Sequence, residues 1–151
     1  MEIKKQNSFT ALCFSEKTTL AGIFKYVRVK ARELYQDAAE NQLEIAGPVY
    51  WIYTGMDGNP ETIFNLDILI PVSKPERYNG NFKIKTVDPI NCLFVLHSGS
   101  WEKLPDTYGQ IFRETAMKHY SPTGTCREVY IHMDFENPEN NLTEVQIGIQ
   151  N

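Results

Sequence analysis

The sequence predicts an α+β domain made of two strand–helix–strand–strand units, and three observations lead to this fold class. A chain of 151 residues has the length of one domain, here residues 1–151, and can bury a sizeable core. Its apolar stretches have strand length, and only two segments show helical spacing of apolar residues. The same order of elements recurs at an offset of about 80 residues, which defines pseudo-repeats at about 9–72 and 91–150.

The first unit begins with the apolar stretch FTALCF, residues 9–14, which predicts a strand. A helix should follow after Thr18 or Thr19, both suitable N-caps, and end near Asn41. Apolar residues recur along it at three- and four-residue spacing, which places them on one face. The stretches GPVYWIYTG (47–55) and FNLDILIPV (64–72) then predict two strands joined by a turn rich in Gly, Asn and Pro.

The second unit repeats this order with NCLFVLHSG (91–99), a helix, REVYIHMDF (127–135) and LTEVQIGIQ (142–150). Pro105 fits only the first turn of that helix, and the HYSPTG stretch at 119–124 ends it. Residues 73–89 are rich in Pro, Gly, Asn and charge, which predicts a surface connector with a short strand near 82–85. Two such units favour pseudo-twofold symmetry, with antiparallel hairpins whose free faces form a shared central cleft.

Side chains alternate along a strand, so parity predicts which residues face the helices. In the 127–135 strand the apolar set of Val129, Ile131 and Met133 should pack on the helices. The opposite faces of the hairpins should then carry polar and aromatic side chains: Tyr50, Asp67, Glu128, Tyr130, His132, Glu144 and Gln146. This set suits a lipophilic cation through charge and cation–π attraction. A solvated polar face of an antiparallel sheet explains the same pattern, and parity does not separate the two interpretations.

Composition and charge narrow the functional classes. A net charge of −4 argues against direct nucleic-acid binding, which requires basic residues to neutralise phosphates. The N-terminus lacks a signal peptide and no segment is apolar enough to span a membrane, so we expect a cytoplasmic protein without a membrane partner. The three cysteines, Cys13, Cys92 and Cys126, form no CxxC pair and indicate neither disulfides nor zinc. The histidines lack metal-ligand spacing, and the sequence indicates no metal and no cofactor.

The order of motifs resembles the GyrI-like family, the effector-binding domain also found fused to bacterial AraC-type and MerR-type transcription regulators. The resemblance rests on GPVYWIYTG, LDILIPV, the stretch from His97 to Leu104, REVYIHMDF and LTEVQIGI, and it spans about Phe9 to Ile149. It implies a duplicated fold, also called SHS2, with a ligand cleft between the halves. It also implies multidrug-type binding of lipophilic cations, with Glu128 as the charge, Glu144 as a second acid and Trp101 as a flat wall near the cleft.

The resemblance favours a small-molecule binding protein with a regulatory or sequestering role, and binding over catalysis. No DNA-binding domain fits ahead of Phe9, so we expect a stand-alone member. Relatives that hydrolyse electrophilic small molecules imply an alternative in which Glu128 is catalytic as a general acid or base. A third alternative is a protein partner, either a transcription regulator or DNA gyrase.

Overall fold

The computed structural model describes residues 1–73 and 75–151, and its nine strands form one antiparallel sheet. The strand order is β1-β7-β9-β8-β4-β5-β2-β6, with β3 pairing beside β5. The strands are β1 (Glu2–Gln6), β2 (Phe9–Thr18), β3 (Glu44–Ile45), β4 (Tyr50–Thr54), β5 (Phe64–Ser73), β6 (Lys83–Val87), β7 (Ile90–Ser98), β8 (Pro122–His132) and β9 (Leu142–Ile149). The helices are α1 (Val29–Glu40) and α2 (Leu104–Met117), with 3-10 segments η1 (Leu20–Tyr26), η2 (Pro75–Arg77), η3 (Trp101–Lys103) and η4 (Pro138–Asn140).

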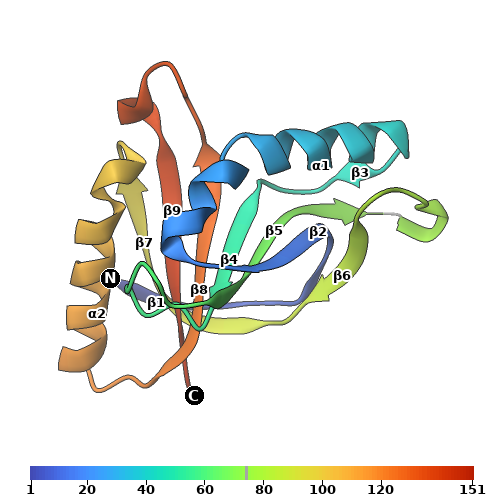
Figure 1. The fold of residues 1–151 in the computed structure, drawn as a ribbon. Helices are drawn as coiled ribbons and strands as arrows, with labels where there is room; N and C mark the ends of the chain where they lie inside the picture. The colour runs from blue at the N-terminus through green and yellow to red at the C-terminus, as the bar shows by residue number, and fades with distance from the viewer. Residues whose placement is uncertain (74) are drawn as a thin grey trace.

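The two predicted hairpins meet at the centre of this sheet. Strand β4 pairs with β5 and β8 pairs with β9, as expected, and β4 and β8 then pair antiparallel with each other. Helix α1 packs on β5 and β2, while α2 packs on β7 (Figure 1). The α+β class with antiparallel strands is therefore confirmed, whereas the pseudo-twofold duplication and the repeat boundaries stay predictions.

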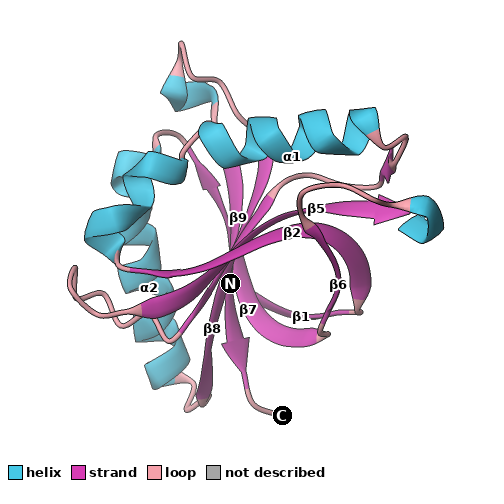
Figure 2. Ribbon diagram, turned by 45° about the vertical axis from the view of Figure 1, so that its right-hand side comes forward, coloured by secondary structure: helices cyan, strands magenta, loops and turns pink. Residues whose placement is uncertain are grey.

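The sheet curves, so that β1 and β6 lie away from the two helices (Figure 2). A short break separates β1 from β2, and another separates β6 from β7. On one side of the breaks β1 pairs with β7, and on the other side β2 pairs with β6. Gln6 pairs with Ile90, and Phe9 pairs with Val87. The curvature gives the sheet a second interior, because the face away from the helices is partly covered by its own outer strands.

The register shows that the face predicted for β8 was wrong. Glu128 pairs with Trp51 on one side and Val145 on the other, and these side chains share the helix-covered face. Val129 instead packs with Tyr50 and other apolar residues on the opposite face. The physical reason is the sheet curvature, since it provides an apolar interior there that the amphipathic pattern alone did not reveal. The parity predicted for β4, β5 and β9 is confirmed.

The first predicted helix is divided in two. Thr19 caps a 3-10 segment, η1, with its Oγ1 accepting from the Gly22 N–H at 3.1 Å. The chain breaks at Val27 and Arg28, where Arg28 adopts a φ of +68°, and α1 then runs to Asn41 as expected. This break turns η1 over the sheet between β4 and α2, where it helps to enclose the site.

Three further observations concern the described residues as a whole. Cys13, Cys92 and Cys126 are free and buried, as small apolar side chains would be. No cluster of three metal-ligating side chains occurs in the described part of the chain. Within the same ranges, neither helix has the length and apolarity to cross a bilayer.

Candidate functional site

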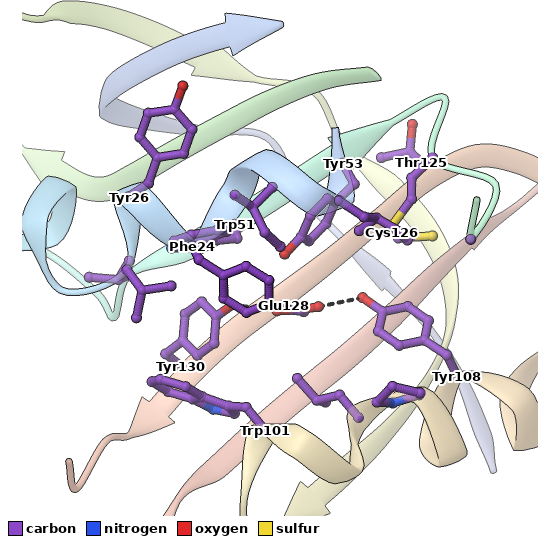
Figure 3. Close-up of a pocket in the computed structure, with 18 of the residues that line it drawn as sticks. Phe24, Tyr26, Trp51, Tyr53, Trp101, Tyr108, Thr125, Cys126, Glu128 and Tyr130 are labelled. Atoms are coloured by element: carbon purple, nitrogen blue, oxygen red, sulfur yellow. Dashed lines mark hydrogen bonds between the residues drawn. The ribbon is translucent and has the colours of Figure 1, made fainter. Parts of the chain in front are cut away.

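An apolar cavity of about 960 Å³ lies on the helix-covered face, between η1 and α2 and above β4 and β8 (Figure 3). Aromatic side chains from η1, β4, η3, α2, β8 and the β8–β9 connection line it: Phe24, Tyr26, Trp51, Tyr53, Trp101, Tyr108, Phe112, Tyr130 and Phe135. This volume and this lining are typical of a site for a drug-sized molecule.

The floor of the cavity follows from strand alternation. Trp51 and Tyr53 project from β4, and Cys126, Glu128 and Tyr130 project from β8. Trp51 is the cross-strand partner of Glu128, so an aromatic ring and a carboxylate lie side by side on one face. The acid is therefore placed by the ladder itself, on a rigid element.

Glu128 is the charged residue at the centre of the floor (Figure 3). Its side chain is 95% buried, given a residue exposure of 5%. One carboxylate oxygen accepts from the Tyr108 hydroxyl at 2.7 Å, and the other accepts from the Tyr130 hydroxyl. Among the described residues no Lys, Arg or His lies within ion-pair distance of it. The site thus holds an acid that the protein solvates only with hydroxyl groups.

Burial raises the pKa of Glu128 above its usual value. Hydrogen bonds from Tyr130, Tyr108 and Tyr53 favour the ionised form and act in the opposite direction, as does the nearby His97. The raised pKa is a direct consequence of placing a carboxyl group in an apolar cavity without a cation.

The tyrosines around this acid remain protonated at neutral pH. Burial, followed by the charge of Glu128, holds the pKa of Tyr53, Tyr108 and Tyr130 well above the ordinary tyrosine value. Their hydroxyl groups are consequently hydrogen-bond donors toward Glu128 or toward a bound molecule.

Trp101 forms one side wall and is held in place by polar contacts. Its Nε1–H donates to Thr143 Oγ1 at 3.0 Å. Its ring lies edge-on to Tyr130 at 5.3 Å and to Phe135 at 5.5 Å between centroids. Such anchoring fixes an indole that would otherwise rotate within the cavity.

Buried His97 supports the turn that carries this tryptophan. Its Nε2 lies 2.9 Å from the Ser100 carbonyl oxygen and its Nδ1 lies 2.7 Å from Thr107 Oγ1. A carbonyl oxygen only accepts, so Nε2 donates to Ser100, and the threonine hydroxyl is the hydrogen-bond partner of Nδ1. His97 therefore joins β7 to α2 and has a structural position behind the wall.

The mouth of the cavity lies between η1 and the β8–β9 connection. Phe24 lines the cavity yet is 75% exposed, an unusual setting for a large apolar ring. Nearby, the Arg28 guanidinium lies over the Phe135 ring, 4.2 Å from the ring centroid. The mouth thus combines an exposed aromatic ring with a cation–π contact between two separate segments.

The structure brings three of the eight residues predicted from sequence into this cavity: Glu128, Tyr130 and Trp101. His132 is exposed at the end of β8 and is not part of the lining. The remaining four lie on the opposite face of the sheet, and their partners are found there.

Tyr50 accepts a hydrogen bond from Gln6 Nε2 at 2.6 Å. Gln146 Nε2 donates to Glu144 at 2.7 Å, and Glu144 forms an ion pair with Lys4.

Asp67 is the fourth residue on that face. It forms an ion pair with Lys85 at 2.8 Å and accepts from the Ser15 hydroxyl at 2.5 Å. Like Glu144, it already has a cationic partner, which distinguishes both acids from Glu128.

Sequence reasoning missed several lining residues because it assigned them to the core. Trp51, Tyr53 and Tyr108 follow the amphipathic patterns of a strand and a helix, and nothing in those patterns marks a cavity. One usable signal was present: two tyrosines and a tryptophan are costly choices for a fully buried face, since each polar atom needs a partner.

Comparison with known proteins places these features in a family. A family model described as a GyrI-like small molecule binding domain matches residues 1–150. A search of curated protein sequences finds no match.

Solved structures with the same fold share little sequence with this chain. The crystal structure of the EcmrR C-terminal domain has a TM-score of 0.82 and 16% identity, covering 99% of this chain and 96% of that one. In the EcmrR–DNA complex the TM-score is 0.81 at 16% identity, and the match spans 99% of this chain but only 56% of that chain.

Of two further similar structures, one is of a protein with a bound ligand and the other is of a hydrolase. SAV2435 bound to tetraphenylphosphonium has a TM-score of 0.67 and 11% identity, with 99% of this chain and 93% of that chain covered. A hydrolase encoded by lin2189 from Listeria innocua has a TM-score of 0.68 and 14% identity, with coverage of 99% and 91%. At such identities these likenesses establish the fold alone.

Proposed function

The chain belongs to the family of GyrI-like small molecule binding domains, and from this premise we propose that its aromatic cavity binds a lipophilic cation, with Glu128 as the countercharge. The observation that carries the proposal is the acid without an ion pair: Glu128 is buried at the centre of an aromatic cavity, and among the described residues its carboxylate accepts hydrogen bonds from hydroxyl groups and pairs with no cation. A cation would supply the missing opposite charge.

The energetic argument is one of desolvation. A carboxylate buried without a cation is costly, and the raised pKa of Glu128 reflects that cost. A bound cation lowers the cost by direct Coulomb attraction in a medium of low dielectric constant. The rings of Trp51, Trp101 and Tyr130 add cation–π attraction of about 0.5–2 kcal/mol each where they contact the charge.

Size and shape support a bulky organic cation. The cavity of about 960 Å³ has room for several aromatic rings, and its lining is mainly apolar. SAV2435, which has the same fold, is bound to tetraphenylphosphonium, a cation of this kind. A regulatory or sequestering role follows as part of the proposal, since the likeness to EcmrR includes its complex with DNA.

Thermal denaturation with tetraphenylphosphonium, hereafter the cationic probe, tests the proposal. The probe should raise the Tm of the wild type, and Glu128→Gln should lose most of that increase because the countercharge is gone. The matched control is Glu144→Gln, which removes the same charge on the opposite face and should retain the increase. An equal effect of the probe on wild type and Glu128→Gln would show that the acid has no part in binding.

Hydrolysis of an electrophilic small molecule is a second candidate, favoured by one observation. Glu128 has a raised pKa and lies beside Tyr108 and Tyr130, whose hydroxyl groups stay protonated. Glu128 could take a proton from an attacking water while a tyrosine donates to the leaving oxygen. Turnover of an aryl epoxide by wild type and its loss in Glu128→Gln would support catalysis, and saturable binding without turnover would refute it.

A further inference from the structure

A second cavity, of about 540 Å³, lies on the opposite side of β8 from the aromatic one. It is bounded by β4, by the turn between β6 and β7 and by the end of β9. Three threonine side chains (Thr54, Thr123, Thr125) and three apolar ones (Val87, Ile90, Ile149) contribute to its lining. The register of β8 against β9 shifts between Pro122 and Cys126, beside the cavity.

Arg127 gives this cavity its chemical character. The residue is only 3% exposed, and it neighbours Glu128 in β8 while pointing to the other face. Its Nη2 donates to the Asp88 carbonyl oxygen at 2.7 Å. Its Nε and Nη1 atoms are buried and have no hydrogen-bond partner. A buried guanidinium normally has its donors satisfied, so these two nitrogens mark an incomplete site.

No protein acid within the described ranges compensates this charge at ion-pair distance. Asp67 also lines the cavity, but it is paired with Lys85 at 2.8 Å and with the Ser15 hydroxyl. The backbone carbonyl of Asp88 accepts the hydrogen bond from Arg127. Asp88 is an exposed residue, and its carboxylate acts on the guanidinium only by Coulomb attraction over a longer distance. Arg127 therefore has no ion-pair partner in these ranges, while the lining as a whole carries two basic side chains, Lys85 and Arg127, and two acidic ones, Asp67 and Asp88.

Burial lowers the pKa of Arg127, because the charged form loses its hydration. A guanidinium nevertheless stays ionised at neutral pH. An anion would supply both the missing charge and the missing acceptors, through charge-assisted hydrogen bonds.

We propose that this second cavity binds a small organic monoanion, a carboxylate with an apolar body, at the guanidinium of Arg127. A small shift of this side chain turns its Nε and Nη1 donors, which are buried in the free protein, toward the anion. Arg127 can pair with one negative charge, and the nearby Asp67 and Asp88 disfavour a doubly charged phosphate. Threonine hydroxyl groups can donate further hydrogen bonds to the carboxylate. Val87, Ile90 and Ile149 provide apolar contact for the rest of the molecule.

Isothermal titration calorimetry with benzoate tests this site on the full chain. Wild type should bind benzoate and not benzamide, its neutral analogue. Arg127→Met should weaken benzoate binding at least about tenfold, which corresponds to 1.4 kcal/mol. Arg113→Met is the matched control, because Arg113 is exposed on α2 and its loss changes only the net charge. Benzoate binding that Arg127→Met leaves intact would overturn the proposal.

A second variant protects the test against misfolding of Arg127→Met. Asp67→Asn removes the acid paired with Lys85 and leaves that cation facing the cavity, so benzoate should bind severalfold more tightly. Unchanged or weaker binding in Asp67→Asn would count against the electrostatic argument.

The Nε–H resonance of Arg127 in nuclear magnetic resonance spectra provides a direct readout. It should shift on addition of benzoate as the free donor gains an acceptor. Gln146 Oε1 is also without a partner and is cross-strand from Arg127, so an internal water molecule between them is the competing explanation. An Nε–H resonance unaffected by benzoate at high concentration would favour that water and overturn the proposal.

Discussion

At the scale of single residues, Glu128 and Arg127 show how alternation along one strand separates two chemistries. The acid faces an aromatic cavity and is contacted by tyrosine hydroxyl groups. The guanidinium faces the opposite cavity and keeps two nitrogens unpartnered. Neither charge pairs with the other, because consecutive side chains of a strand point to opposite faces. The two proposals above assign a bound molecule to each of them as its partner.

The raised pKa of Glu128 predicts how binding of the cationic probe depends on pH. In the free protein, burial favours the protonated acid, whereas a bound cation favours the ionised one. Below the raised pKa, binding must therefore expel a proton, so affinity rises with pH through that pKa and then levels off. The probe has a permanent charge, and only the protein titrates.

Calorimetry of the probe between pH 4.5 and 8, an interval set by the ordinary pKa of a glutamate at about 4.3, checks this dependence. Titrations in buffers with different ionisation enthalpies should also reveal proton release at the acidic end. An affinity that stays flat across this interval in wild type would mean that Glu128 is not the group that meets the cation.

At the scale of elements, the pairing of β8 with β9 positions both cavities, and Gly148 is a point where the two strands approach closely. A side chain at position 148 would lie 3.1 Å from the Thr125 carbonyl oxygen and would collide with the Thr123 hydroxyl. The register shift in β8 occurs at this place, next to the second cavity. The geometry of this segment therefore depends on the absence of a side chain.

Gly148→Ala should lower the free energy of unfolding by about 1–3 kcal/mol, since a buried overpacked contact must shift backbone. Gly109→Ala is the opposite case, because its new methyl group would meet only Arg113 Nη1 at an ordinary 3.5 Å. Alanine favours a helix interior over glycine, so that variant should gain about 0.5–1 kcal/mol. Urea denaturation measures the free energy of unfolding of both variants. If both changes had the same sign, the packing argument would be contradicted.

Much of this element scale was predictable from sequence, and the failures have identifiable physical causes. Strand and helix patterns predicted the two hairpins and α2, because periodicity reflects burial directly. The break at Arg28 depends on a single residue with positive φ, which no periodicity signals. The face of β8 depends on the curvature of the sheet, a long-range property, so Val129 was assigned to the helices when it packs on the opposite face of the sheet. Of the same predicted set, Ile131 is exposed and only Met133 packs on the helix-covered core.

The same limit explains the candidate site. Glu128, Tyr130 and Trp101 line the cavity, although the parity argument that grouped Glu128 with Tyr50 and Glu144 placed it on the wrong side of the sheet. The family resemblance indicated Glu128 and Trp101 independently of that parity. The acid's isolation from cations could not be read from the chain, because pairing partners such as Lys4 and Lys85 come from distant strands.

At the scale of the whole molecule, one curved antiparallel sheet provides two interiors. Helices α1 and α2, with η1, enclose the face with the aromatic cavity, and the outer strands of the sheet enclose the other (Figures 1 and 2). Strand β8 is part of the wall of both cavities. The two proposals therefore place a cation and an anion on opposite sides of one strand of this chain.

A crystal structure of the chain with the cationic probe is the most direct measurement of the central claim. The probe should lie between η1 and α2, with its phosphonium centre closer to the Glu128 carboxylate than to any other acid and with its phenyl rings against Trp51, Trp101 and Tyr130. A probe found on the opposite face, beside Glu144 or Asp67, or one whose charge avoids Glu128 within the aromatic cavity, would contradict it.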